Sequence, residues 1–78
     1  MNVDDKNFIN LILAYTDYRL YSLDRYDARY KVVALEIIEE IYLGSSYIVR
    51  SEFKTLFRNS LEYELVAVFE RLDKDDEK

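Results

Sequence analysis

Residues 26–44, YDARYKVVALEIIEEIYLG, decide the fold class, because their apolar side chains recur every three or four positions. At that period the side chains fall on one face of an α-helix. The main apolar row consists of Tyr26, Tyr30, Val33, Ala34, Ile37, Ile38 and Ile41. Gly44 follows at a point where helices commonly end in a left-handed residue. The pattern predicts a helix over about residues 24–43.

Two further segments show the same helical period. Before this stretch the row is Phe8, Leu11, Ile12, Tyr15 and Tyr18, and after it the row is Phe53, Leu56, Phe57, Leu61, Leu65, Val68, Phe69 and Leu72. We expect Asp4 and Ser51 to cap these flanking helices, because their oxygens can accept hydrogen bonds from free N–H groups of a first turn. The sequence therefore predicts an all-α protein, a small three-helix bundle with helices at about residues 5–21, 24–43 and 51–73.

The boundary between the first two helices rests on weak signals. The chain has no Pro and its one Gly is Gly44, so no residue breaks a helix outright between positions 5 and 43. An alternative is therefore that these two helices fuse into one long helix, which could be buried only in an oligomer. In either case we expect a single helical domain over residues 1–78, with residues 73–78 as a frayed acidic tail.

The composition removes most side-chain chemistry. The 78 residues include no His and no Cys, which excludes imidazole bases, thiolate nucleophiles, disulfides and His- or Cys-ligated metals. One Gly cannot build a glycine-rich phosphate loop, and the acidic tail lacks the later ligands of a calcium loop. The sequence therefore predicts no enzyme activity, no cofactor and no metal site.

Charge and hydropathy point to a small acidic protein outside the membrane. There are 11 basic and 16 acidic residues, which give a net charge of −5. No apolar run approaches the ~18–20 residues that span a bilayer, and the first residues lack the layout of a secretory signal. We expect a cytoplasmic protein. Because so short a chain buries a limited share of its surface, we also expect a homodimer or a protein partner.

The helix predicted at residues 24–43 carries a second apolar row, formed by Ala28, Val32, Leu35 and Tyr42. A helix that is apolar on two faces must be covered on both. The second row is core if this helix lies between the other two, and an interface if it binds a second copy or another protein. The interface is favoured, because each helix of a three-helix bundle contacts the others along one wide side.

The chain contains eight tyrosines, and four of them fall off the apolar rows. Tyrosine is enriched in protein interfaces, although scattered surface tyrosines are the plainer explanation. The candidates for a protein interface are Val32, Leu35, Tyr42, Tyr21, Tyr47 and Tyr63.

Basic and aromatic side chains alternate over residues 18–31, a pattern that can bind phosphates and stack on bases. The basic candidates are Arg19, Arg25, Arg29 and Lys31. Asp24 and Asp27 dilute their charge, and an acidic protein is repelled by nucleic acid at long range.

These observations favour a protein that acts by binding another protein, as an inhibitor, antagonist or adaptor. The acidic charge favours a basic partner, of which nucleic-acid-handling enzymes are the largest class. The low use of Gly and Pro, with many Asn, Lys, Ile, Tyr and Asp residues, resembles products of A/T-rich phage or plasmid genomes. One alternative function is a dimeric nucleic-acid-binding helical protein, and another is a structural self-association module.

Overall fold

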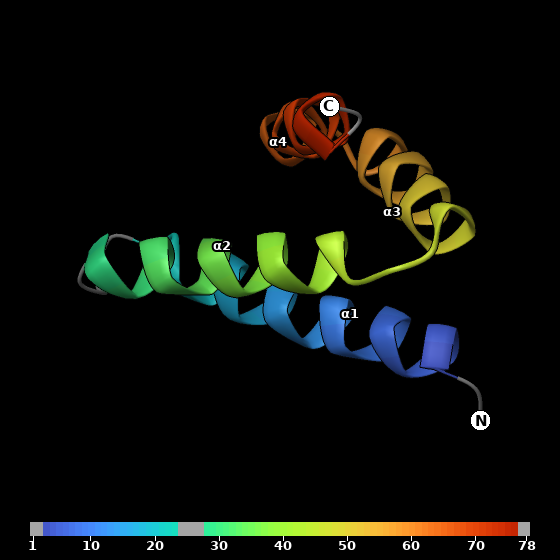
Figure 1. Ribbon diagram of the computed structural model, residues 1–78. Coiled ribbons are helices and arrows are strands. Elements are labelled where there is room, and N and C mark those ends of the chain that lie inside the picture. Colours follow the sequence, from blue (N-terminus) through green and yellow to red (C-terminus); the bar gives the residue numbers. More distant parts are fainter. Residues whose placement is uncertain (1–2, 24–27, 77–78) are drawn as a thin grey trace.

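The computed structural model describes residues 3–23 and 28–76, and its ordered elements are all helices (Figure 1). The helices are α1 (Val3–Tyr21), α2 (Ala28–Leu43), α3 (Tyr47–Asn59) and α4 (Tyr63–Asp76). The prediction of an all-α fold is confirmed. The prediction of three helices is wrong, because the segment expected as one helix over residues 51–73 forms α3 and α4.

The first two helices form an antiparallel hairpin, and α3 and α4 lie together on one side of it (Figure 1). The alternative of one fused helix is therefore wrong. Two small buried residues, Ala14 of α1 and Ala34 of α2, lie in the hairpin. At its far end the Asn7 side-chain amide donates a hydrogen bond to the carbonyl of Gly44 at 3.0 Å. α1 and α2 thus each bury part of the other's apolar surface.

Two predicted helix starts differ from the structure. α1 begins at Val3, so Asp4 lies inside its first turn, and the Asp4 side chain is outside the described part of the chain. α3 begins before Ser51, and its N-cap is Ser46, whose hydroxyl accepts a hydrogen bond from the Val49 N–H at 3.3 Å. Ser46 has the same capping chemistry as Ser51. The predicted tail is also partly helical, because α4 continues to Asp76.

The break between α3 and α4 is a helix-ending turn at Leu61, a position where other helices usually have glycine. The Glu62 N–H donates to the Phe57 carbonyl at 2.8 Å, and the Leu61 N–H donates to the Arg58 carbonyl at 3.1 Å. These two bonds form a Schellman motif, which needs a left-handed residue after the helix. Leu61 supplies it, with φ of 61°. Because no Gly marks this position, the sequence pattern indicated a continuous helix.

Replacing Leu61 with glycine should stabilise the protein. A side chain with a Cβ is disfavoured in the left-handed region by about 1–2 kcal/mol, and Leu61 is 70% exposed, so little burial is lost. We expect Leu61→Gly to raise the free energy of unfolding by about 0.5–1 kcal/mol in urea titrations. Leu61→Ala keeps the Cβ and should bring no gain. A glycine variant less stable than the alanine variant would contradict the prediction that the backbone at Leu61 is strained.

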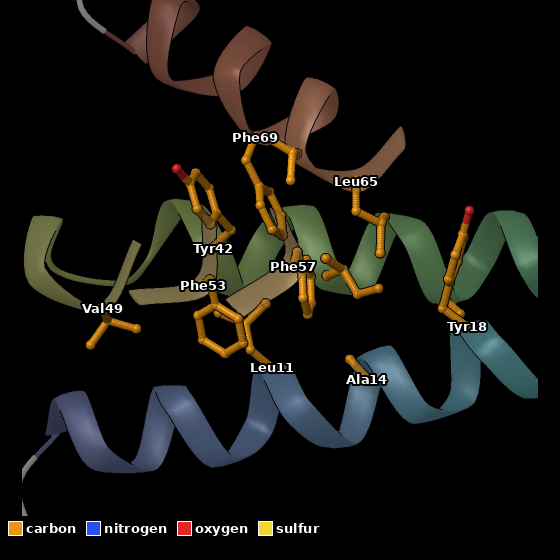
Figure 2. Packing of buried hydrophobic residues seen from close by; sticks show 12 residues of the cluster. Leu11, Ala14, Tyr18, Tyr42, Val49, Phe53, Phe57, Leu65 and Phe69 are labelled. Carbon is orange, nitrogen blue, oxygen red and sulfur yellow. The ribbon is translucent and has the colours of Figure 1, made fainter. Parts of the chain in front are cut away.

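The core draws three buried hydrophobic residues from each helix, and aromatic rings dominate it (Figure 2). The residues are Leu11, Ala14, Tyr18, Ala34, Ile38, Tyr42, Val49, Phe53, Phe57, Leu65, Val66 and Phe69. The Tyr42 and Phe69 rings stack at 4.2 Å between centroids, and Phe69 stacks on Phe57 at 5.6 Å. Phe57 in turn contacts Phe53 edge-on at 5.7 Å. The ring series joins α2, α3 and α4 into one core.

A buried arginine ties the end of α2 to both later helices. Arg50 of α3 is only 6% exposed. Its Nε donates to the Tyr42 carbonyl at 3.1 Å, and its Nη2 donates to the Leu43 carbonyl at 2.7 Å. Its Nη1 reaches the carboxylates of Asp76 at 3.1 Å and Asp73 at 3.5 Å in α4. One guanidinium thus satisfies two carbonyls that the end of a helix leaves without partners.

Removing this guanidinium should cost more stability than removing an exposed one. In Arg50→Met the two carbonyls and the α4 carboxylates lose a buried partner, so we expect a loss of about 3 kcal/mol or more in the free energy of unfolding. The control is Arg58→Met, which removes an exposed ion pair with Glu70 at 3.4 Å. That pair should be worth less than about 1 kcal/mol. Equal losses in urea titrations of the two variants would contradict the role of Arg50.

Candidate protein-binding surfaces

The six predicted interface residues do not form one surface. Tyr42 is fully buried, and Leu35 is half-buried against the core. Tyr21 is half-buried too, and its ring lies 5.5 Å from that of Tyr30. The remaining three, Val32, Tyr47 and Tyr63, are exposed on three different helices. The second apolar row of α2 is therefore core at Leu35 and Tyr42 rather than an interface.

Tyr42 is turned inward by polar contacts as well as by its ring. Its hydroxyl donates a hydrogen bond to Asp73 Oδ1 at 2.8 Å, and the other oxygen of Asp73 accepts one from Lys54 Nζ at 2.6 Å. Burial raises the pKa of the Tyr42 phenol, and the Asp73 carboxylate raises it further. The hydroxyl therefore stays protonated and keeps donating at neutral pH. A buried tyrosine needs such a partner, and α4 provides it.

Asp73 should contribute to stability in a pH-dependent way. Burial alone would raise the pKa of its carboxyl, but hydrogen bonds from Lys54 and Tyr42 hold that pKa below its ordinary value of 3.8. A carboxyl with a lowered folded-state pKa stabilises the protein above its unfolded-state pKa, and that stability is lost as the pH falls through the folded-state value.

We therefore expect wild-type stability to fall more steeply below about pH 4 than that of Asp73→Asn, which should already be less stable at pH 7. The matched control is Asp75→Asn, because Asp75 is exposed and forms no ion pair with another described residue. It should keep the wild-type slope when urea unfolding is followed from pH 7 to acid. Identical slopes in all three proteins would contradict the prediction.

The structure divides the main row of α2: Ala34 and Ile38 are buried in the core, whereas Tyr30, Val33 and Ile37 are exposed. With three exposed residues of α1, these three form the outer face, defined by Ile9, Leu13, Leu20, Tyr30, Val33 and Ile37. Each of these side chains is between 40% and 60% exposed. In α1 the residues Leu11, Ala14 and Tyr18 point the other way, into the core (Figure 2). No described element covers the outer face, since α3 and α4 lie across the hairpin from it (Figure 1).

A groove between α1 and α2 opens on this face. Its volume is about 170 Å³. Ala14 and Ala34 are buried small residues in its lining, and Val33 and Ile37 line it from α2. Asp17 is the one carboxylate that lines it. The groove exists because two alanines meet between the helices, where larger side chains would fill the space.

The exposed charged side chains that form no ion pair are mostly acidic. Five basic residues form ion pairs within the chain, namely Arg19, Arg50, Lys54, Arg58 and Arg71. By contrast, six exposed acidic residues form no ion pair with any residue the structure describes, and these are Asp17, Glu36, Glu40, Glu52, Glu64 and Asp75. The charge that remains available to a partner is therefore mainly negative.

The predicted basic residues are partly engaged by acids and aromatic rings. Arg19 forms an ion pair with Glu62, which also accepts a hydrogen bond from the Tyr15 hydroxyl at 2.7 Å. Lys31 Nζ lies 5.4 Å from the centroid of the Tyr18 ring. Arg29 is exposed at the start of α2. The predicted contribution of Arg25 lies outside the described residues.

The acidic side chains do not gather into a metal site. Among the residues that the structure describes, no group of three or more acidic side chains is placed to hold a metal ion. No described helix has the length and hydropathy needed to cross a membrane. Comparison with known proteins found no matching family, no matching curated protein and no matching solved structure.

Two features of the structure, the buried Arg50 and the outer face, were not predicted from the sequence. Arg50 lies three residues before Phe53 and seven before Phe57, so helical spacing alone places it on their buried face. The sequence could therefore have predicted that Arg50 is a buried charged residue. The outer face had a weaker signal, since Leu13 is two positions from Leu11 and points about 200° away around the helix. The one available signal for the outer face was that α1 has apolar residues on the side opposite its buried row.

Proposed function

We propose that this protein is not an enzyme and that it acts by binding a basic protein, as an inhibitor, antagonist or adaptor. The observation that supports this function is the division of surface charge described above. Five basic side chains are neutralised by ion pairs within the chain, and exposed acids such as Glu52 and Asp75 are left to attract a partner. Complementary charge raises the rate of encounter and excludes partners of the wrong sign.

The expected partner is a protein whose own function needs a positive surface. Enzymes that handle nucleic acid are the largest class of such proteins, because they neutralise phosphates with Lys and Arg. An acidic helical protein bound to such a surface would compete with the nucleic acid. The 11 basic residues keep this chain from being a dense mimic of DNA, so surface shape and tyrosines such as Tyr47 and Tyr63 would add to the binding.

Direct binding of nucleic acid is the second candidate, and it has weaker support. It needs a basic patch, but Arg19 is already paired with Glu62. Close to Lys31, burial raises the pKa of Tyr18, and the carboxylates of Glu64 and Glu62 raise it further. Negative charge therefore surrounds the cations that would have to bind phosphate.

Capture from a lysate of the source cells tests the proposal. The tagged protein, treated with nuclease and washed at moderate salt, should retain one dominant basic protein at near-stoichiometric yield by mass spectrometry. Release should follow rising salt, because exposed charges are screened over about 10 Å at 0.1 M.

Charge variants make the test specific. The triple variant Glu36→Gln, Glu52→Gln and Asp75→Asn should lose most of the captured protein. The matched control, Lys6→Gln with Lys74→Gln, alters exposed cations instead and should keep it. Equal capture by both variants would contradict the charge argument. Co-purifying nucleic acid without nuclease, and no protein partner with it, would favour the second candidate.

A further inference from the structure

The outer face is an apolar surface at the upper end of what a monomer leaves in water, and patches of that size are often interaction sites. Its six apolar side chains expose on the order of 600 Å², judged from their fractional exposure, whereas isolated monomers rarely leave contiguous apolar patches above a few hundred Å². A standard protein interface uses about 800 Å² from each partner. The outer face with its polar rim is therefore close to the size of one complete interface.

The charged residues at the edges of this face are placed so that the same face of a second copy would present the opposite charges to them. In α1, Lys6 and Leu13 are seven residues apart and share a side of the helix, with Asp17 one turn further on. In α2, Arg29 precedes Val33 by one turn, and Glu40 follows Val33 by seven residues. Each helix thus carries a cation near its start and an acid toward its end, with apolar side chains between.

We propose that the outer face is covered by a second copy of this chain, so that the protein is a homodimer in which two α1–α2 hairpins pack face to face. Because α1 and α2 are antiparallel (Figure 1), a two-fold axis lying between the faces, either along or across the helices, stacks every helix on an antiparallel one. The start of one helix then meets the end of another. Lys6 and Arg29 meet acidic residues of the second copy in both arrangements.

A basic foreign partner is a poorer match for this face than for the rest of the surface. Lys6 and Arg29 lie at its edges, and its centre is apolar, as in homodimer interfaces. The groove of about 170 Å³ has room for one aliphatic side chain, since a cavity of about 150 Å³ holds a benzene molecule. Leu13 of the second copy is a side chain of suitable size. Glu52 and Asp75 belong to α3 and α4 and stay exposed in the dimer for the partner proposed above.

Sedimentation of the purified chain tests this inference without any foreign partner. We expect a dimer across about 5–500 μM. Leu13→Glu and Val33→Glu should each weaken dimerisation by on the order of 100-fold or more, because two-fold symmetry buries the new charge twice. Both residues are more than half exposed in the single chain, 60% and 52%, so the monomers should keep the wild-type circular dichroism.

The control is Ile48→Glu, an exposed apolar residue of α3 that should leave the dimer intact. A wild-type chain that is monomeric at 500 μM would overturn the inference, and so would a dimer that both outer-face variants leave unchanged. Lys6→Glu should weaken the dimer several-fold, and either Asp17→Lys or Glu40→Lys should restore it. Failure of both reversals to restore it would overturn the face-to-face packing. Capture of a basic protein by the monomer would still support the proposed function.

Discussion

The buried guanidinium of Arg50 is the contact on which the arrangement of the other helices depends. It donates to the last carbonyls of α2 and reaches the carboxylates at the end of α4, while its own backbone belongs to α3. A buried charge without partners would cost several kcal/mol, so a structure that buries Arg50 must bring these three helix ends together. Tyr42 is held at the same place, with its ring 5.2 Å below the guanidinium carbon and its hydroxyl on Asp73.

The orientation of α2 follows from this cluster, and the surface of the protein follows from that orientation. With Tyr42 turned inward, Ala34 and Ile38 face the core at intervals of four residues. The row of Tyr30, Val33 and Ile37 is then left on the opposite side of the hairpin from α3 and α4. The apolar outer face therefore follows from the way α2 packs, whereas exposed acids such as Glu52 and Asp75 lie on α3 and α4. These two surfaces carry the two associations proposed above, one with a second copy and one with a basic protein.

Several features of the fold could be predicted because they depend on local chemistry. The helical period of residues 8–20 and 28–43 was visible from apolar spacing, and Ser46 and Ser51 have the same capping chemistry. The break at Leu61 could not be predicted in this way. Its left-handed backbone is stabilised by two hydrogen bonds and by the packing of α4 on α3, which outweigh the preference of leucine for continued helix.

The sequence by itself determined that the protein is all-α and acidic and that it lacks imidazole and thiol chemistry, because composition and period are properties of the chain alone. It could not decide which members of the two apolar rows of α2 are buried, and the core takes Ala34 and Ile38 from the main row and Tyr42 from the second. Both rows contain aliphatic residues and tyrosine, so the burial free energies of their members are similar. Only the tertiary structure distinguishes them, because the partners that favour Tyr42 over Tyr30, namely Phe69, Asp73 and Arg50, come from α3 and α4.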